Sequence, residues 1–446
     1  MAHATPTYDN HIIGLGATGM AVARFLARRD ESFVVFDSRA EPPLAAQFAR
    51  DFPHTELHCG VFDIAAFARA KRLIVSPGVA LREPAIQHAL ALGIPAIGDI
   101  ELFAQTARAP VIAITGANGK STVTTLVGDM ARDAGMDVRI GGNLGTPALD
   151  LLGESEPQLY VLELSSFQLE TTDTLAPRAA VVLNISADHM DRYADVAEYS
   201  AAKARIYTHA QTRIANADDA VVMAMVKHDA ACIAFTLHTP RADQYGIIEA
   251  DGARWLARGT QRLINERELK IAGRHNTANA LAALALGKVV GLRDDAMCQT
   301  LHRFAGLPHR TQWVAERDGV TWFNDSKGTN VGATVAALQG MPGKVVLIAG
   351  GDGKGQDFAE LRPALQQFGR GIVLIGRDAS LIARAVGDAV PVRPAHDMRE
   401  AVQQAQQLAQ RGDVVLLSPA CASFDMYKGY THRGEVFVEA VRSLLA

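Results

Sequence analysis

Residues 115–122, Thr-Gly-Ala-Asn-Gly-Lys-Ser-Thr, have the residue types of a phosphate-binding loop. The segment lies between an apolar run and a helical pattern, so we expect a strand to enter the loop and a helix to leave it. Backbone N–H groups of such a loop cradle phosphate oxygens, while Lys120 would neutralise their charge and Ser121 would bind Mg²⁺. The usual pattern has a glycine where Ile114 stands, so this loop is a shortened variant.

Acidic and polar residues follow the next apolar runs. Glu163 lies near the end of the run at residues 159–164, and a carboxylate at the end of a strand near a phosphate loop suits Mg²⁺. The polar segment 184–193 follows another run and contains His189, which is either a metal ligand or a loop histidine satisfied by hydrogen bonds. Lys203 lies in a helical stretch, and taken alone it predicts a surface lysine.

A second glycine pattern, formed by Gly14, Gly16 and Gly19, lies between a predicted strand and a predicted helix. Its glycines allow backbone N–H groups to approach a phosphate, and the helix N-terminus favours negative charge. Asp37 closes the next apolar run, so the literal prediction is an NAD site of the Rossmann type. The pattern does not identify the nucleotide, and a tight strand–helix turn without a ligand is an alternative.

Three polar loops near the C-terminus, at residues 324–330, 350–354 and 418–425, each follow an apolar run. Taken singly, each fits a turn of small residues. Loops at the carboxyl ends of parallel strands share one edge of the sheet, so we expect all three to border one cleft. His309 and Arg310 stand shortly before the first of them.

Short β-branched apolar runs alternate with longer helical patterns, which is typical of βαβ units and mostly parallel sheets. The order predicts an α/β protein of three domains: a Rossmann-like N-terminal domain (1–98), a central P-loop ATPase-type domain with a parallel sheet (99–306) and a Rossmann-like C-terminal α/β domain (307–446). Strands are predicted at residues 11–16, 33–37, 72–75, 110–115, 159–164, 179–184, 344–349, 371–375 and 413–417. Helices are predicted at residues 19–29, 120–133, 275–290, 358–368 and 398–410, and a small antiparallel patch at 245–273.

The composition is that of an ordinary globular protein. Of the 446 residues, 48% are hydrophobic and 21% are charged, which argues against intrinsic disorder. A formal net charge of −4 and the lack of a long basic tract argue against nucleic-acid binding. The four cysteines form no CxxC pair, no run of about 18 apolar residues could span a membrane, and residues 1–10 lack a signal-peptide core. We therefore expect a cytoplasmic protein that contacts neither nucleic acid nor membrane.

Taken together, these segments resemble the Mur ligases of peptidoglycan synthesis over nearly the whole chain. The phosphate loop alone would fit any Mur ligase or a folylpolyglutamate synthase. The more specific segments are residues 141–147, 163–168, 188–193, 306–310, 324–330 and 418–423. The resemblance implies an ATP-dependent amide ligase that joins D-glutamate to UDP-N-acetylmuramoyl-L-alanine. It also implies a monomer that uses ATP, two Mg²⁺ ions and CO₂ as a lysine carbamate.

The resemblance also implies roles for individual residues. The catalytic residues would be Lys120, Glu163, His189 and Lys203, with Lys203 carbamylated. The Mg²⁺ ligands would be Ser121, Glu163, His189 and Lys203. ATP would contact Gly116, Asn118, Gly119, Lys120, Ser121, Thr122, Asn276, Asn279, Arg310 and Asp325. The UDP-linked substrate would contact Ala17, Thr18, Asp37, Ser38, Arg39, Gly78 and Asn143. The glutamate would contact Lys327, Thr329, Lys354, Ser423 and Tyr430.

Two positions depart from the family pattern: Gly328 stands where Ala is common, and Tyr430 stands where Phe is expected. The glycine would loosen its loop, and the tyrosine would add a hydroxyl to the glutamate pocket. Neither position touches the phosphate chemistry, in which a carboxylate is phosphorylated so that an amine can displace the phosphate. Because Arg310 and Asp325 belong to a different domain from Lys120, we expect that domain to close over the acyl phosphate.

Other functions stay open at this point. A Mur-type ligase could add a different amino acid, for example L-glutamate, because the sequence does not fix stereochemistry. A nucleotide-gated P-loop protein would hydrolyse ATP as a switch without any amino acid. An NAD-dependent oxidoreductase would explain residues 14–19 but not the phosphate loop. A folate ligase is disfavoured, because the N-terminal glycine pattern implies a second nucleotide-bearing substrate.

Overall fold

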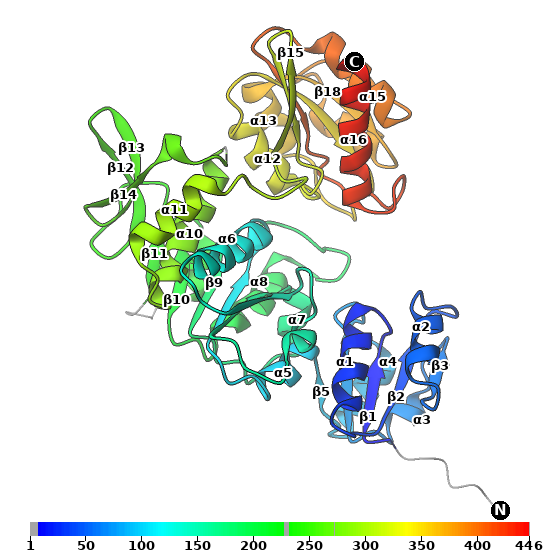
Figure 1. Cartoon of the computed structure of the whole chain (residues 1–446). Helices are drawn as coiled ribbons and strands as arrows, with labels where there is room; N and C mark the ends of the chain where they lie inside the picture. Colours follow the sequence, from blue (N-terminus) through cyan, green and yellow to red (C-terminus); the bar gives the residue numbers. More distant parts are fainter. Residues whose placement is uncertain (1–7, 227–231, 272, 446) are drawn as a thin grey trace, which may run out of the picture.

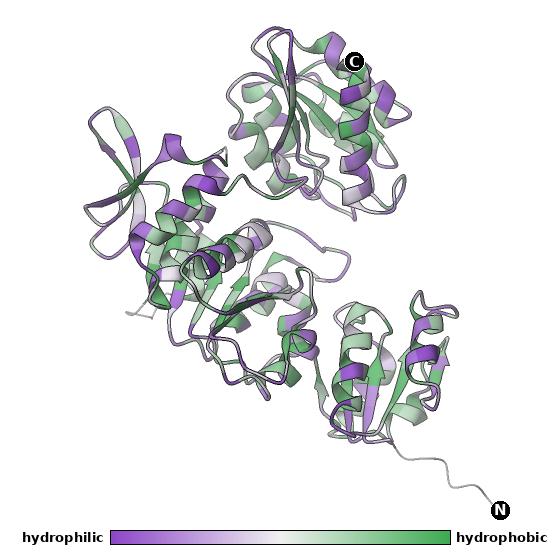
Figure 2. Ribbon diagram, viewed as in Figure 1, coloured by the Kyte–Doolittle hydropathy of each residue, from purple (hydrophilic) through white to green (hydrophobic). Residues whose placement is uncertain are grey.

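The chain forms three α/β units in sequence order (Figure 1). The computed structural model describes residues 8–226, 232–271 and 273–445. Each unit is built on its own sheet, whose strands are largely buried apolar runs, as expected where helices cover both faces. Figure 2 shows these central strands as mainly hydrophobic and the outward helix faces as largely hydrophilic. Among the described residues, no helix is both long enough and apolar enough to cross a bilayer.

The first unit is a five-stranded parallel sheet in the order β3-β2-β1-β4-β5. Its strands are β1 (Asn10–Ile13), β2 (Phe33–Asp37), β3 (Leu57–Cys59), β4 (Arg72–Val75) and β5 (Ala96–Ile97). Its helices are α1 (Ala17–Ala27), α2 (Ala45–Asp51), α3 (Ile64–Phe67) and α4 (Pro84–Ala91). The strand order reverses beside β1, which is where ligands usually bind in open α/β sheets.

The central unit is a nine-stranded sheet in the order β14-β13-β12-β11-β10-β9-β6-β8-β7. Its strands are β6 (Val111–Thr115), β7 (Val138–Gly142), β8 (Leu159–Glu163), β9 (Ala179–Val182), β10 (Arg213–Asn216), β11 (Ile233–Phe235), β12 (Tyr245–Ala250), β13 (Ala253–Arg258) and β14 (Gln261–Asn265). The helices are α5 (Asp99–Ala104), α6 (Lys120–Asp133), α7 (Ser166–Glu170), α8 (Val196–Ala204), α9 (Ala220–Met225), α10 (Arg274–Val289) and α11 (Asp294–Arg303), with 3₁₀ turns η1 (Ala148–Leu151), η2 (Arg205–Tyr207) and η3 (Glu266–Glu268).

The central sheet is mixed and mostly parallel, as the predictions of a parallel sheet and of an antiparallel patch at its end together imply. The strands that carry the phosphate loop pair in parallel, but β12, β13 and β14 form antiparallel hairpins at one edge. These hairpins confirm the antiparallel patch expected at residues 245–273, of which residue 272 lies outside the described part.

The third unit is a six-stranded sheet in the order β15-β16-β20-β17-β18-β19, with only β15 and β16 antiparallel. Its strands are β15 (Gln312–Arg317), β16 (Val320–Asn324), β17 (Val345–Gly350), β18 (Gly369–Ile375), β19 (Val392–Pro394) and β20 (Val414–Leu417). Its helices are α12 (Val331–Gln339), α13 (Leu361–Phe368), α14 (Ala379–Val386), α15 (Met398–Leu408) and α16 (Tyr430–Leu445).

Most predicted elements are present with small shifts at their ends. The predictions for β2, β4 and α6 are confirmed with the same bounds. The first strand ends at Ile13, because Gly14 turns the chain with a φ of +98°. The helix predicted at 358–368 begins only at Leu361, and the strand predicted at 179–184 ends at Val182.

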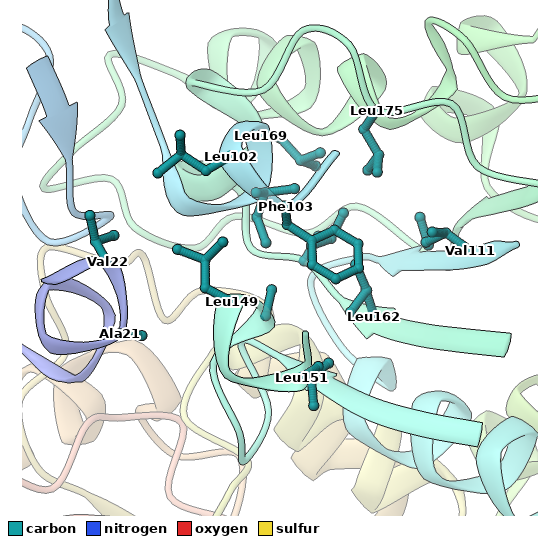
Figure 3. Packing of buried hydrophobic residues seen from close by; sticks show 14 of the residues in the cluster. Ala21, Val22, Leu102, Phe103, Val111, Leu149, Leu151, Leu162, Leu169 and Leu175 are labelled. Atoms are coloured by element: carbon teal, nitrogen blue, oxygen red, sulfur yellow. The ribbon is translucent and has the colours of Figure 1, made fainter. Parts of the chain in front are cut away.

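One hydrophobic cluster joins the first unit to the central one. In Figure 3, Ala21 and Val22 of α1 face Leu149 of η1, and Leu102 and Phe103 of α5 continue the same cluster into the central unit. A bidentate ion pair between Arg24 and Asp150 (2.5 and 3.1 Å) borders this contact. The hydrophobic clusters of the third unit, within the described ranges, contain only its own residues. Apolar burial therefore fixes the first two units to each other but not the third.

Candidate active site

The phosphate-binding loop connects β6 to α6 as predicted. Gly116 (φ +155°) and Gly119 (φ +84°) adopt backbone conformations that side chains disfavour. A Cβ on Gly119 would also lie 2.4 Å from Oδ1 of Asn279, so the close approach of α10 requires a glycine. Nζ of Lys120 donates to the carbonyl oxygens of Gly116 (2.8 Å) and Ala117 (2.9 Å). The ammonium group thus lies within the loop, near where such loops hold phosphate oxygens.

Lys203 is buried against this loop, so the prediction of a surface lysine from its helical stretch is wrong. The residue is 1% exposed, and its Nζ hydrogen-bonds to the carbonyl oxygen of Gly116 (2.9 Å) and to Oγ1 of Thr115 (3.3 Å). Nζ also lies 4.6 Å from the centre of the Tyr199 ring. Burial, followed by the charge of Lys120, lowers the pKa of Lys203 well below its ordinary value. The amine is therefore shifted toward its neutral, nucleophilic form.

Glu163 presents an unsatisfied carboxylate oxygen beside the loop. The residue ends β8 and is buried, and its Oε1 accepts a hydrogen bond from Nδ2 of Asn143 (2.6 Å). Its Oε2 is buried without a hydrogen-bond partner. A buried carboxylate oxygen of this kind is costly unless a donor or cation satisfies it, so the position suits a bound cation.

His189 lies on the loop between β9 and α8 in a left-handed conformation (φ +58°). Its ring meets the Phe167 ring edge-on, with centres 4.9 Å apart, and its Nε2 lies 3.8 Å from Oδ2 of Asp188. Burial lowers the pKa of His189 despite the opposing charge of Asp188, which favours the neutral ring that can bind a metal. No group of three or more His, Cys, Asp or Glu side chains suited to a metal occurs among the described residues. A Mg²⁺ ion here would therefore need further oxygen donors.

The third unit reaches the phosphate loop with two polar side chains. Nη2 of Arg310 donates to Oγ of Ser121 at 2.6 Å. Nδ2 of Asn330 donates to Oδ1 of Asn118 (3.2 Å) and lies 3.4 Å from Oδ2 of Asp188. These contacts bring the loop at residues 324–330 against the phosphate loop, although the two are about two hundred residues apart in sequence.

Asp325 is buried in the same loop. It accepts hydrogen bonds from the backbone N–H of Thr311 (3.0 Å) and from Oγ of Ser418 (2.8 Å), and burial raises its pKa to about 6. A Cβ on Gly328 would lie 2.5 Å from Oγ of Ser418 and 2.6 Å from Oδ2 of Asp325. Gly328 therefore packs tightly against this pair, contrary to the expectation of a looser loop.

A cavity of about 490 Å³ lies between the central and third units. Of the residues predicted to bind ATP, it is bordered by Asn118, Gly119, Thr122, Asn276, Asn279, Arg310 and Asp325. Gly116, Lys120 and Ser121 belong to the adjoining loop but do not border the cavity. Asn276 and Asn279 on α10 hydrogen-bond to each other (3.3 Å), and Leu183, Phe235 and Leu237 give the cavity an apolar side that suits a flat base.

A second cavity, of about 510 Å³, lies at the carboxyl edge of the first sheet. All seven residues predicted to bind the UDP-linked substrate border it: Ala17, Thr18, Asp37, Ser38, Arg39, Gly78 and Asn143. Burial alone would raise the pKa of Asp37, but hydrogen bonds from Arg39 (2.6–2.9 Å) and from the N–H of Leu15 (2.7 Å) hold it at about 2. The Asp37 carboxylate therefore stays ionised and holds the Arg39 guanidinium beside this cavity.

The five residues predicted to bind glutamate are only partly gathered. Nζ of Lys327 lies 4.2 Å from the centre of the Tyr430 ring, and Lys327 borders the cavity of about 490 Å³. Burial, then the charges of Arg310 and Lys120, lowers the pKa of Lys327 to about 8. The charge of Lys354 lowers the pKa of His189, which places Lys354 near that histidine. Of the five residues, only Lys327 borders one of the two cavities. Thr329, Lys354, Ser423 and Tyr430 border neither of them.

Two asparagines that brace the phosphate loop were missed at the sequence level. Oδ1 of Asn184 accepts from the N–H of Asn118 (2.8 Å), and its Nδ2 donates to the carbonyl oxygen of the same residue (3.1 Å). Asn330 is the second, through the contacts described above. Asn184 begins the polar segment 184–193, and Asn330 ends the polar segment 324–330. Their positions in these segments were the only indication in the sequence that they contribute to the site. Which partner each amide would meet depends on the packing of separate strands.

Three family models match the chain. They are the "Mur ligase MurD-like, N-terminal domain" over residues 8–98, the "Mur ligase middle domain" over 114–287 and the "Mur ligase, glutamate ligase domain" over 309–421. With the phosphate loop and the three α/β units in the same order, the chain belongs to the Mur ligase family.

Curated relatives named UDP-N-acetylmuramoylalanine–D-glutamate ligase are similar to this chain over nearly its whole length. The protein of Nitrosococcus oceani is 57% identical over 437 residues, which cover 98% of this chain and 96% of that protein. The protein of Pseudomonas savastanoi pv. phaseolicola is 54% identical, and that of Pseudomonas aeruginosa 52%, each with 97% of both chains covered.

Solved structures of other ligases share the fold. UDP-N-acetylmuramate-alanine ligase MurC from Thermotoga maritima has a TM-score of 0.60 at 19% identity, covering 98% of this chain and 99% of that one. A pseudomurein peptide ligase type C from Methanothermus fervidus has a TM-score of 0.59 at 17% identity, covering 97% and 100%. Likeness at these identities concerns the fold alone.

We predict that Glu163→Gln weakens the binding of Mn²⁺, a spectroscopic substitute for Mg²⁺, by about tenfold or more. Glutamine still accepts the hydrogen bond from Asn143 but lacks the negative charge. The affinity can be measured by electron paramagnetic resonance with a non-hydrolysable ATP analogue present. Asp99→Asn is the control, because Asp99 is also buried with one unpartnered oxygen but lies on α5, away from the loop. Equal affinity in the Glu163→Gln variant and the unmodified protein would refute the cation position.

Proposed function

We propose that this protein is an ATP-dependent ligase that joins D-glutamate to UDP-N-acetylmuramoyl-L-alanine and releases ADP and phosphate. The contact of Arg310 with Ser121 carries the proposal, because it joins the glutamate-ligase domain to the phosphate loop. The choice of substrates is supported by relatives of that name at 52–57% identity over nearly the whole chain.

The arrangement suits acyl activation by phosphoryl transfer. A carboxylate is a poor acyl donor, so its oxygen first takes the γ-phosphoryl group of ATP and ADP leaves. The amine of glutamate then attacks the acyl phosphate, a tetrahedral intermediate forms, and phosphate leaves with the C–O bond electrons. The transfer needs mainly positioning and charge neutralisation, which Lys120 and Arg310 supply from the two sides of the site. The third unit above the loop would keep water from the acyl phosphate.

The residues present fit a Mg²⁺ ion, because the unpartnered Oε2 of Glu163 is an oxygen donor of the kind that this cation prefers. Ser121 and His189 would complete the set from neighbouring loops. When bound, Mg²⁺ would neutralise charge on the phosphoryl oxygens. A second Mg²⁺ would use a carbamate on Lys203.

Lys203 suits carbamylation by its burial and its neighbours. A neutral amine adds to CO₂ with loss of a proton, and burial favours the neutral amine here. The product would replace a cation that Lys120 repels with anionic oxygens that a hard cation prefers. The exposed lysines of the chain lack this environment.

The two remaining substrate sites follow from the predicted residue sets. We assign the cavity of about 510 Å³ to the uridine and diphosphate, because the glycine turn before α1 offers backbone N–H groups and Asp37 holds the cationic Arg39 beside it. We assign a carboxylate of glutamate to Lys327, with Thr329, Lys354, Ser423 and Tyr430 around the amino acid. The cavity of about 490 Å³ would hold the adenosine of ATP.

The proposal includes a cytoplasmic monomer with functional domains at residues 1–98, 99–306 and 307–446. ATP and nucleotide-linked sugars are cytoplasmic metabolites, and each unit has its own sheet. Membership of a ligase family replaces the NAD interpretation of the N-terminal glycines.

The direct test is phosphate release from ATP with UDP-N-acetylmuramoyl-L-alanine and either D-glutamate or L-glutamate. We expect release only with the nucleotide sugar and D-glutamate together, and a fall of about 100-fold or more in Lys120→Ala, which controls for contaminating ATPase. Release with the nucleotide sugar and L-glutamate, but not with D-glutamate, would overturn the assignment of D-glutamate as the substrate. Release without either substrate would favour an ATP-driven switch over a ligase.

A carbamate on Lys203 should be visible directly. We expect a carbamate carbonyl signal in the ¹³C NMR spectrum of the protein equilibrated with ¹³C-bicarbonate, and its loss in Lys203→Arg. Lys354→Arg, on a partly exposed lysine, should keep the signal. A spectrum without this signal, or one that persists in Lys203→Arg, contradicts the assignment.

The affinity for D-glutamate should depend on the charge of Lys327. This side chain is a cation below its pKa of about 8 and neutral above it, so carboxylate binding should weaken as the pH rises through about 8, by up to tenfold per unit. Calorimetric titration with the nucleotide sugar and an ATP analogue present measures this. Lys327→Arg stays charged throughout, so its profile should lack that step. The same step in both proteins would assign the titration to another group.

A further inference from the structure

Arg192 lies on the same loop as His189 but extends into the first unit. Its Nη1 donates to the carbonyl oxygen of Pro77 (3.1 Å) and its Nη2 to that of Val79 (3.2 Å). Only 12% of the side chain is exposed. A loop of the central unit thus holds a loop of the first unit through a largely buried guanidinium.

The guanidinium is fixed from the central side as well. Nη2 of Arg192 pairs with Oε2 of Glu170 on α7 (2.9 Å). The other carboxylate oxygen of Glu170, Oε1, accepts a hydrogen bond from the Tyr193 hydroxyl (2.5 Å). The guanidinium also stacks over the Phe167 ring, 4.4 Å from its centre. Lysine could not reproduce this set, because only the planar fork of arginine reaches a carboxylate and two carbonyls at once.

The held loop borders the cavity assigned to the UDP-linked substrate. Ser76, Pro77, Gly78 and Val79 all line that cavity. Oγ of Ser76 donates to the carbonyl oxygen of Gly14 (3.0 Å), so the loop is packed on the glycine turn. A ligand that orders this cavity would therefore also order the two carbonyl groups that Arg192 binds.

The other end of the contact chain is His189. The Phe167 ring under Arg192 also meets the ring of His189, with centres 4.9 Å apart. Direct contacts therefore run from the glycine turn through Arg192 and Phe167 to the histidine beside the phosphate loop.

We propose that Arg192 is a positioning residue that couples occupancy of the first-unit cavity to the placement of His189 in the phosphoryl-transfer site. This deepens, and rests on, the proposed ligase function. The coupling would make the site bind ATP and metal better once the nucleotide sugar is present. Hydrolysis of ATP without an acceptor would thereby be suppressed.

The test measures coupling rather than activity alone. The dissociation constant of AMP-PNP with Mg²⁺ is determined by calorimetry with and without saturating UDP-N-acetylmuramoyl-L-alanine. We expect the nucleotide sugar to tighten AMP-PNP binding about fivefold or more in the unmodified protein. In Arg192→Met this ratio should fall to about one, while the affinity for AMP-PNP alone stays unchanged and kcat falls more than KM rises.

Two further variants keep the result interpretable. Arg192→Met leaves the half-buried Glu170 carboxylate without its cation, so the Arg192→Met/Glu170→Gln double variant removes that uncompensated charge and should show the same loss of coupling. Arg82→Met is the matched control, because the exposed Arg82 donates to the carbonyl oxygen of Asp191 (3.0 Å) across the same interface but does not contact Phe167 or Glu170. It should keep the coupling ratio of the unmodified protein.

Three results would overturn the proposal: no coupling in the unmodified protein, an unchanged ratio in both Arg192 variants, or an equal loss in Arg82→Met. If Arg192→Met weakens AMP-PNP binding equally with and without the nucleotide sugar, the coupling ratio is unchanged and Arg192 only stabilises the interface. Failure of the ligase proposal has a different signature, namely no phosphate release with both substrates.

Discussion

Three basic side chains, the half-buried Lys120 and Arg310 and the fully buried Lys203, surround one phosphate loop, and the rest of the site depends on this concentration of basic groups. Burial lowers the pKa of Lys120, Lys203 and Arg310, while the negative charge of Glu163 opposes all three shifts. Asp188 also opposes the shifts of Lys120 and Lys203, and Asp325 opposes that of Arg310, but desolvation outweighs these carboxylates at all three groups. Holding the three groups together therefore costs folding free energy. A bound polyphosphate would offset this cost, because its negative charge would neutralise the basic side chains. This explains why two helices and a separate domain converge on a loop of eight residues.

The units around this site are joined in two different ways. The first and central units share a hydrophobic cluster, which ties the cavity at the first sheet firmly to the sheet that carries the loop. The third unit meets the loop through polar contacts such as those of Arg310 and Asn330. Polar contacts can be exchanged for water at little net cost, whereas exposure of an apolar cluster cannot. The chemistry of these interfaces supports the expectation that the third unit closes over the loop while the first unit stays attached to the central one.

Contacts between the units also explain why the site contains residues that no sequence motif identifies. The phosphate loop, Glu163 and the polar segment 184–193 were found because each stands where an apolar run ends. Their partners were not found in this way. Arg192 acts on Pro77 and Val79, more than a hundred residues earlier, through a geometry that no local pattern encodes. The tight packing of Gly328 on Ser418 likewise depends on two neighbouring strands, β16 and β20.

The sequence by itself determined the α/β class, the three-unit order, the phosphate loop and α6, because these depend on local periodicity and on glycines at a strand–helix joint. Its motifs also carried the family resemblance that the comparisons confirm. Only the tertiary structure decided that Lys203 is buried rather than exposed, and that Arg310 and Asn330 of the third unit meet the phosphate loop. The physical reason is that burial and pKa depend on which elements pack together, and a helical stretch looks the same in sequence whether its lysine faces water or a phosphate loop.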